Sequence, residues 1–350
     1  MRKFVPLFVV LLLFTGMAQA NDAAADVDGL MSRYQGDVPG ASLLVIKDGK
    51  PLLRRGYGLA NLETHEAAGP ATNYRLASVT KQFTAAAILL LAERGTLRLD
   101  DHVRRWIPEL PATHEAITIR QLLSHGGGLI DYEDLMPAQV TEQISDADVL
   151  RMLAAEPRSY FAPGTSYRYS NGGYVLLGLI VERASKQSLP DFLARNIFQP
   201  LGMTHTLLYV LGGSEVTHRA YGYSEENGHW NRTDQSPTSA TRGDGGIYSS
   251  IDDMAKWDAA LYDHRLLSDA SRKLAFSAQN TVRDEPDVDA YGFGWRIHGE
   301  VLWHSGESMG FRNVIIRWPK QHLTVVLLSN RNDPEPYRTA LAIGQRFLQP

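Results

Sequence analysis

The chain has 350 residues, no cysteine and a formal net charge of −4, from 35 Lys and Arg against 39 Asp and Glu. The absence of cysteine excludes disulfides, thiol catalysis, zinc–thiolate sites and lipid attachment at an N-terminal cysteine. A mildly acidic charge balance disfavours nucleic acid as the main partner. Stability therefore has to come from an apolar core, which a chain of this length can bury.

Residues 1–20 have the pattern of a cleavable secretory signal peptide. Arg2 and Lys3 precede an apolar run over residues 4–14, and Ala18 and Ala20 form an A-x-A-like cleavage site. That run is short for a bilayer span, and no later run approaches about 18 uninterrupted apolar residues. We expect a mature chain that begins at Asn21 with a formal charge of −6, soluble after cleavage, and either periplasmic or secreted.

Strand patterns are found at both ends of the chain. Two apolar runs flank Lys47-Asp48-Gly49-Lys50, where the Asp-Gly pair predicts a hairpin. Near the other end, three further strands are predicted over residues 301–306, 311–318 and 322–330. A final helix is expected over about residues 336–347.

Helical periodicity dominates the middle of the chain, over residues 75–95, 119–125, 146–156, 173–185, 189–198 and 250–262. No linker-like composition and no internal repeat separates these parts. We therefore predict an α/β (α+β) fold in a single domain over residues 28–347. Both chain ends (about 38–77 and 285–347) form an antiparallel sheet of five strands, beside a largely helical region (about 78–284). The segment 212–246 has no clear period and is expected to form loops near a binding site.

Ser78 and Lys81 stand at the start of the helix predicted in residues 75–95. A spacing of three residues corresponds to about 300° of rotation and about 4.5 Å of rise, so the hydroxyl and the amine project from nearly the same face. The helix N-terminus adds free N–H groups and a positive dipole end, which favour an alkoxide or an oxyanion. An activated serine nucleophile needs this arrangement. The alternative is an N-cap serine followed by a solvated lysine.

Two further short motifs carry polar groups next to apolar segments. Tyr169 and Asn171 are two residues apart in a loop before the next apolar helix, where a phenol can relay a proton and a carboxamide can bind a substrate carbonyl or amide. A core tyrosine with a turn asparagine is the alternative. His304-Ser305-Gly306 ends a strand, where a glycine lets another backbone approach, as an extended substrate would. Taken alone, this histidine favours a structural role.

The order S-x-x-K, Y-S-N and H-S-G resembles the serine β-lactamase and penicillin-binding-protein superfamily, specifically its class C-like branch. That branch also holds D-alanyl-D-alanine carboxypeptidases, D-aminopeptidases and esterases. The likeness covers about residues 28–345 and includes the connecting segments 122–129, 197–206 and 245–257. It implies an antiparallel sheet flanked by helices, a helical region beside it, and an active site between the two.

The resemblance also implies roles for individual residues. It makes Ser78 the nucleophile, Lys81 its partner and Tyr169 the proton relay. Asn171 would orient the acyl side chain. The backbone N–H groups of Ser78 and Glu307 would form the oxyanion hole, and the substrate would bind along His304, Ser305, Gly306 and Glu307.

Two departures from the superfamily motifs bear on the substrate. Y-S-N replaces the S-D-N of class A and no deacylation carboxylate is recognisable, which argues against class A. His304 stands where β-lactamases of this branch carry lysine. Because a histidine of pKa near 6.5 is mostly neutral at pH 7, we expect weak or no β-lactamase activity. We also expect His304 to attract anionic groups only once it is protonated at lower pH.

Other motifs are assigned to local structure. Residues 124–129, SHGGGL, lack the lysine of a phosphate-binding loop and are expected to form a tight turn near the site. Arg242-Gly243-Asp244 is followed by two glycines and is expected to be a turn rather than an adhesion signal. The chain has no H-E-x-x-H, so neither a metal nor a cofactor is expected.

The sequence thus favours an exported serine hydrolase that forms an acyl-enzyme on Ser78. Esters, D-amino-acid amides and peptidoglycan-like D-alanyl peptides are the candidate substrates, and a small molecule or a peptide is the expected partner. The alternatives are a penicillin-recognising sensor that is acylated without turnover, a true class C-type β-lactamase, and a scaffold that has lost its chemistry. The acyl group, the leaving group and the oligomeric state stay open.

Overall fold

The structure is a computed structural model that describes residues 26–213 and 215–348, so the predicted signal peptide lies outside the described residues. An antiparallel sheet built from both chain ends runs through the molecule, as predicted. Its order is β10-β11-β12-β13-β14-β15-β1-β2. The five long strands are β1 (Ala41–Lys47), β2 (Lys50–Tyr57), β13 (Val301–Ser308), β14 (Phe311–Trp318) and β15 (Leu323–Ser329). Three short strands extend the sheet: β10 (Asn280–Thr281), β11 (Ala290–Tyr291) and β12 (Arg296–His298).

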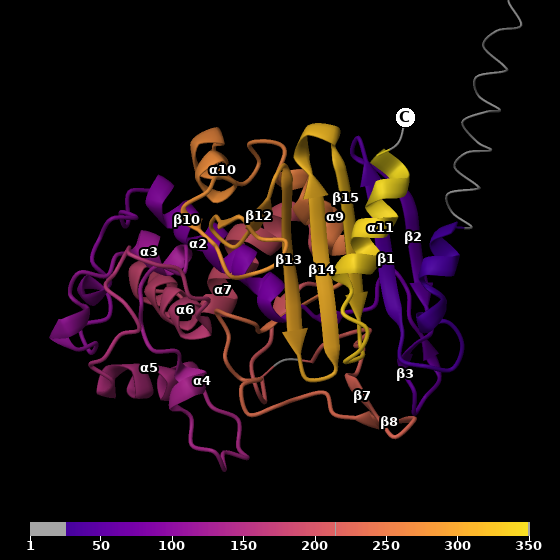
Figure 1. Ribbon diagram of the computed structural model, residues 1–350, viewed down its shortest axis with the longest axis horizontal. Helices are drawn as coiled ribbons and strands as arrows, with labels where there is room; N and C mark the ends of the chain where they lie inside the picture. Colours follow the sequence, from indigo (N-terminus) through magenta and orange to yellow (C-terminus); the bar gives the residue numbers. More distant parts are fainter. Residues whose placement is uncertain (1–25, 214, 349–350) are drawn as a thin grey trace, which may run out of the picture.

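Both faces of the sheet are covered. The central strands β15 and β1 are apolar along nearly their whole length, which is the pattern of strands buried on two sides. Helix α11 (Tyr337–Leu348) packs on one face against β14 and β15, and α9 (Ile251–Ala260) packs against β1 and β15. Figure 1 shows α11 in front of the sheet and α9 behind it. The chain ends are therefore joined through the sheet, while the middle of the chain supplies α9 to one face and otherwise packs beside the sheet.

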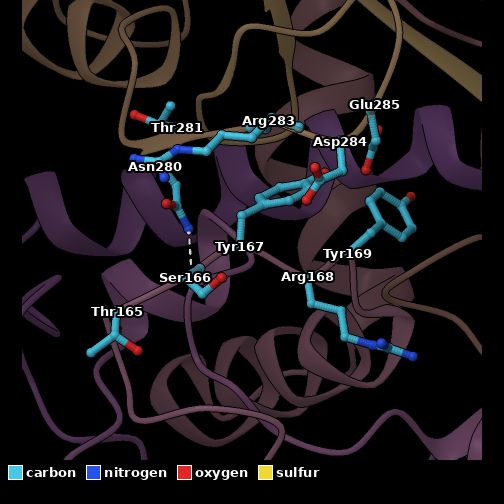
Figure 2. Close-up of a pocket in the computed structure, with 12 residues that line it drawn as sticks. Thr165, Ser166, Tyr167, Arg168, Tyr169, Asn280, Thr281, Arg283, Asp284 and Glu285 are labelled. Carbon is cyan, nitrogen blue, oxygen red and sulfur yellow. Dashed lines mark hydrogen bonds between the residues drawn. The ribbon is translucent and has the colours of Figure 1, made fainter.

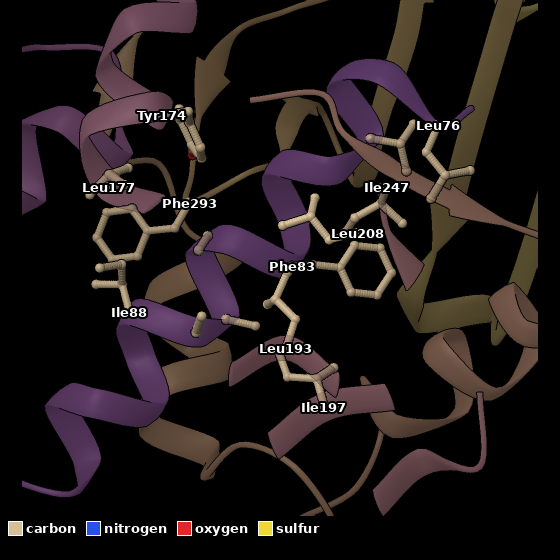
Figure 3. Close-up of a cluster of buried hydrophobic side chains, with 14 of the residues drawn as sticks. Leu76, Phe83, Ile88, Tyr174, Leu177, Leu193, Ile197, Leu208, Ile247 and Phe293 are labelled. Carbon is tan, nitrogen blue, oxygen red and sulfur yellow. The ribbon is translucent and has the colours of Figure 1, made fainter. Parts of the chain in front are cut away.

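The helical region is built around α2 (Lys81–Glu93), which a 3₁₀ turn (Ala77–Thr80) precedes. Residues 81–91 of α2 are all buried, so the helix has no solvent-facing stripe. Figure 3 shows side chains from several other segments packed around this helix, among them Leu177, Leu208 and Phe293. The helix predicted at residues 75–95 is confirmed, with Ser78 in the 3₁₀ turn at its entrance.

The other helical predictions are confirmed with small shifts of their ends. The confirmed helices are α3 (Ile119–Leu123), α5 (Asp146–Ala155), α6 (Asn171–Ser185) and α7 (Leu189–Leu193), which a π-helical turn (Ala194–Phe198) continues. The short helices α4 (Tyr132–Leu135), α8 (Gln199–Leu201) and α10 (Asp269–Ala275) were not predicted. Short strands also lie outside the main sheet: β3 (Leu59–Asn61), β4 (Glu66–Ala67), β5 (Tyr74–Arg75), β6 (Leu207–Leu208) and β9 (Ile247–Ser249).

The segment 212–246 differs from its prediction, because it contains the hairpin β7 (Tyr223–Glu226) and β8 (His229–Arg232). Asn227 and Gly228 form the turn, with φ of 51° and 78°. An Asn-Gly pair with two positive φ values is a strong hairpin signal, and the sequence analysis missed it because the flanking strands are short and polar. Nowhere in the described ranges 26–213 and 215–348 does a helix combine the length and apolar character needed to cross a membrane.

Candidate active site

Ser78 lies where the 3₁₀ turn before α2 meets β13 of the sheet. Ala77, the residue before it, has a φ of +47°, a conformation that costs an L-residue free energy and marks a sharply bent backbone. A Cβ built on Gly306 would lie 2.0 Å from the carbonyl oxygen of Leu76. Only glycine therefore lets β13 approach the turn that carries Ser78. The backbone that Gly306 admits on this face is that of the protein's own turn.

Lys81 is fully buried, and its ammonium is surrounded by oxygen atoms. Nζ donates to Ser78 Oγ at 3.0 Å, to Asn171 Oδ1 at 2.7 Å and to the backbone oxygen of Asp244 at 2.9 Å. An ammonium has three N–H donors, so these three acceptors use all of them. Each acceptor is formally neutral. The arrangement fixes the amine on Ser78 and leaves the positive charge available to an oxygen anion.

Asn171 is held by the start of α6. Ser170 caps this helix through its hydroxyl, which accepts from Gly173 N–H at 3.0 Å and donates to Asp131 Oδ2 at 2.6 Å. Asp131 also caps α4, so one carboxylate joins two helix starts. The Asn171 amide faces Lys81 with its oxygen and donates from Nδ2 to Glu133 at 3.2 Å. Its orientation is therefore defined from both sides.

Tyr169 lies between Lys81 and an aromatic cluster. Lys81 Nζ is 4.9 Å from the centre of its ring, and the His125 ring is 4.3 Å away. His125 has a φ of +56°, and its Nδ1 accepts the N–H of Ser170 at 3.1 Å. The Tyr169 hydroxyl is buried and makes no hydrogen bond within the part of the chain that the structure describes. The turn at residues 124–129 thus lies near the site, as predicted, and His125 holds the tyrosine segment in place.

Ser78 and Glu307, whose backbone N–H groups are expected to form the oxyanion hole, line a small cavity of about 50 Å³ together with Asn171. Strand β12 pairs only with residues 301–303 of β13. On that side, residues 304–308 have no strand partner among the described residues. A substrate backbone could add to β13 there.

The His304 ring is buried inside the protein, and both of its nitrogens have hydrogen-bond partners there. It is 1% exposed, its Nε2 lies 2.9 Å from the Tyr291 hydroxyl, and its Nδ1 lies 2.6 Å from the Ser305 carbonyl oxygen. A neutral ring satisfies both contacts, with Nδ1 donating and Nε2 accepting. Burial, together with the nearby Arg296 charge, lowers the pKa of His304 well below its usual value. Its burial and its two contacts therefore argue against the expectation that His304 becomes a cation near pH 6.5.

Arg296 supplies a positive charge at this place. Its Nη1 donates to Ser305 Oγ at 3.1 Å, and its guanidinium lies 5.6 Å from the centre of the Tyr169 ring. On the solvent side it forms an ion pair with Glu285 at 3.5 Å. The motif search missed Arg296 because it lies on β12, outside the three motifs. Only the pairing of β12 with β13 brings it to Ser305.

A second, larger pocket adjoins Tyr169. It has a volume of about 620 Å³ and lies between residues 164–169 and 280–285. Figure 2 shows Tyr169 and Glu285 at the same end of this groove. Its lining carries both signs of charge, from Arg168, Arg283, Asp284 and Glu285. The groove is therefore suited to polar groups.

Two acidic residues of the small cavity were also missed. Asp244 lies in the turn after Arg242, and burial raises the pKa of its carboxyl. Burial, followed by the charges of Asp131 and Asp244, raises the pKa of Glu133. The glycines around Asp244 were a usable signal, because a Cβ on Gly243 would lie 2.4 Å from the Tyr174 carbonyl oxygen and so requires a close approach to α6.

The site residues taken from the sequence thus come from segments far apart in the chain, on the turn before α2, the start of α6 and β13. Hydrogen bonds join Ser78, Lys81 and Asn171 directly. Tyr169 adjoins them through its ring, and Glu307 lines the same cavity as Ser78. His304 and Ser305 bond to Tyr291 and Arg296, and both of these lie next to the Tyr169 ring.

Comparison with known proteins agrees with this geometry. Residues 18–348 match the family model described as Beta-lactamase. The chain is 34% identical to penicillin-binding protein 4* of Bacillus subtilis (strain 168), over 86% of this chain and 70% of that protein. It spans 64% of the length of a second curated relative.

Two solved structures are similar over most of the chain. An octameric penicillin-binding protein homologue from Pyrococcus abyssi has a TM-score of 0.83 and 26% identity, over 94% of this chain and 77% of that one. The D-amino acid amidase from Ochrobactrum anthropi SV3 has a TM-score of 0.79 and 25% identity, over 94% and 99%. The resemblance of the motifs to the superfamily is confirmed, and the chain belongs to the β-lactamase family, within the serine β-lactamase and penicillin-binding-protein superfamily.

Proposed function

We propose that this protein is an exported serine hydrolase that forms an acyl-enzyme on Ser78. The observation that carries the proposal is the buried Lys81 ammonium, which donates to Ser78 Oγ at 3.0 Å and is held by Asn171 and Asp244. A lysine that only stabilised the fold would not have to donate to a serine hydroxyl that lines a cavity. A lysine that serves a nucleophile does.

In acylation, Ser78 Oγ attacks the substrate carbonyl carbon and a bond to the leaving group breaks. The Lys81 ammonium stabilises the developing oxygen anion on Ser78, and Tyr169 passes the hydroxyl proton to the leaving group. The backbone N–H groups of Ser78 and Glu307 receive the carbonyl oxygen as it becomes negative. In deacylation, water attacks the carbonyl carbon of the acyl-enzyme, its proton passes through Tyr169 to Ser78 Oγ, and the bond from Ser78 to the acyl group breaks. The buried Tyr169 hydroxyl, which has no partner within the described residues, is consistent with a group that pairs only when substrate is bound.

Esters, D-amino-acid amides and D-alanyl peptides are the proposed substrates. Support comes from the penicillin-binding protein relative and from the D-amino acid amidase, whose structure is similar over nearly its full length. The small cavity beside Ser78, of about 50 Å³, favours a compact acyl side chain, and the 620 Å³ groove beyond Tyr169 favours a polar leaving group. Efficient β-lactam hydrolysis is not expected, because His304 replaces the lysine of the β-lactamases and the nearby Arg296 is paired with Glu285.

A carboxylate on the leaving group has Arg296 as its partner in this proposal. Arg296 touches Ser305, lies beside Tyr169 and carries a permanent charge. His304 supports this strand as a neutral side chain, through its contacts with Tyr291 and Ser305.

Intact-mass spectrometry tests the proposal. The protein is mixed with short-chain aryl esters, D-alanyl peptides, D-amino-acid amides and a cephalosporin, and the mass is followed from seconds to hours. A transient acyl adduct on Ser78 with release of product is expected for at least one of the first three classes. An adduct that persists for hours with every compound would indicate the sensor instead. No adduct in any mixture and no turnover would exclude acyl-enzyme chemistry on these substrates.

A further inference from the structure

We propose that Glu285 is a specificity-determining residue, which occupies Arg296 in the free protein and so disfavours substrates whose leaving group carries a negative charge. The inference rests on the proposed function, because it concerns the leaving-group side of the same site. It assigns to the loop between β10 and β11 a role in the choice of substrate.

Arg296 is the residue for which Glu285 and a substrate would compete. Its side chain is 18% exposed, and Nη1 is already bonded to Ser305 Oγ at 3.1 Å. Its Nε is buried without a hydrogen-bond partner in the described part of the chain. The Trp303 and Tyr169 rings lie 4.9 and 5.6 Å from the guanidinium, and they restrict its movement. The side of the guanidinium that pairs with Glu285 is directed to the groove that Glu285 lines, and a ligand carboxylate would approach from this side.

Glu285 stands on that side. It lines the 620 Å³ groove, as Figure 2 shows, and its Oε2 lies 3.5 Å from Arg296 Nη2. At this separation the two charges attract each other but form only a poor hydrogen bond. The pair is therefore weak, and another carboxylate can take the place of Glu285. The Glu285 side chain is 31% exposed, which leaves it room to turn away.

An anionic leaving group that enters the groove must displace Glu285 or lie beside it. Either event costs free energy, by loss of the ion pair or by repulsion between two carboxylates that share one guanidinium. A neutral leaving group meets neither cost. Arg168 and Arg283 also line the groove, but Arg296 is the one cation that contacts Ser305 among the described residues, so the competition with Glu285 is felt there.

The test compares Glu285→Gln with Asp284→Asn. Both variants remove one carboxylate from adjacent residues of the same groove, but Asp284 has no contact with Arg296 in the described structure. The substrates are the phenyl ester and the 3-carboxyphenyl ester of N-acetyl-D-alanine, which differ in one charge on the leaving group. The readout is the ratio of their kcat/KM values, charged over neutral. Thermal unfolding verifies that each variant is folded.

Glu285→Gln is expected to raise this ratio by about three- to thirtyfold, the effect of one partly screened charge pair. Asp284→Asn is expected to change it by less than about twofold. In an Arg296→Gln background, Glu285→Gln is expected to lose most of its effect, because the two residues act on one another. Equal effects of Glu285→Gln and Asp284→Asn would overturn the proposal, and so would an undiminished effect in the Arg296→Gln background.

A binding measurement separates this proposal from the proposed function. The free leaving groups, phenol and 3-hydroxybenzoate, are titrated into each protein and followed by ligand-observed NMR. A gain in 3-hydroxybenzoate binding in Glu285→Gln alone supports the role of Glu285 even if Ser78 is never acylated. Unchanged binding, with normal acylation of Ser78 in the wild type, overturns the role of Glu285 and leaves the hydrolase proposal intact.

Discussion

At the scale of single residues, the candidate site depends on how buried polar groups share their hydrogen bonds. Lys81 donates to three neutral oxygens, and Asn171 is fixed between Lys81 and Glu133. Such a network restricts the movement of these side chains, because the loss of any one of them leaves a buried partner without its hydrogen bond. The geometry at Ser78 is thus set by a network of hydrogen bonds within the protein itself.

Replacing the proposed nucleophile or its partner tests this network. Ser78→Ala is expected to abolish labelling by a fluorophosphonate and all ester hydrolysis. Lys81→Ala and Tyr169→Phe are each expected to slow acylation by at least the ~10²-fold typical of a lost acid–base group. Lys273→Ala, an exposed lysine on α10, is the control and should stay within about twofold. Wild-type hydrolysis by Ser78→Ala would contradict the central proposal.

The charge at β13 gives a prediction about pH. The pKa of His304 is held well below its usual value, so this residue stays neutral as the pH falls from 8 to 6 and adds no charge. Arg296 is protonated throughout that range. The charged-to-neutral substrate ratio of kcat/KM should therefore be flat from pH 8 to 6, and Arg296→Gln should lower it by about three- to thirtyfold. A ratio that rises with a midpoint near pH 6.5 would restore His304 as the anion-binding group.

At the scale of elements, the site depends on close approaches between backbones. The 3₁₀ turn with Ser78 is pressed against β13 at Gly306, and the Asp244 turn is pressed against α6 at Gly243. Only glycine fits at these two positions, because a Cβ atom at either one would clash with another backbone segment. The three motifs lie on separate elements, and these contacts hold them at the distances that the proposed chemistry needs.

Gly306→Ala tests the first of these contacts. The new methyl group would lie 2.0 Å from the Leu76 carbonyl oxygen, so either β13 or the turn with Ser78 has to move. A displacement of about 1 Å is enough to lower acylation by roughly 10²-fold. The control is Gly69→Ala, where a Cβ would meet nothing within 4 Å. Acylation at the wild-type rate by folded Gly306→Ala would show that the contact does not position Ser78.

At the scale of the whole molecule, the helix α9 is tied to the sheet by a buried charge. Asp258 accepts from Arg317 Nε at 2.7 Å and from Thr324 Oγ1 at 2.8 Å, and these two partners are opposite each other on β14 and β15. Arg317 is 1% exposed and lies 4.5 Å from the centre of the Tyr262 ring. One carboxylate thus joins two strands and a helix from the middle of the chain.

Asp258→Ala is expected to lower the free energy of unfolding by about 3 to 5 kcal/mol, because it leaves the Arg317 charge buried without its partner. Chemical denaturation measures the change. Glu300→Gln removes a partner from the exposed pair with Lys320 and should cost less than about 1 kcal/mol. Similar losses in the two variants would show that burial of the Asp258 pair has no special weight.

The sequence predicted the elements with strong local signals. The hairpin at Asp48-Gly49, the strands near the C-terminus and the buried helix after Ser78 all follow from apolar periodicity and turn residues. The Asn227-Gly228 hairpin was missed because its strands are polar and short, and the strands β10 to β12 were missed because two or three residues give no period. Local sequence patterns do not predict an element that forms only because it pairs with neighbouring strands.

By itself, the sequence determined the family, the sheet built from both chain ends and the identity of the candidate nucleophile with its lysine. These follow from spacing along the chain, which is a local property. Only the tertiary structure decided the charge beside β13: it buried His304, which lowers the pKa of its ring, and it brought Arg296 to Ser305 and Glu285 to Arg296. Burial and the distance between charges set both the pKa and the pairing, and neither is fixed until distant segments pack together.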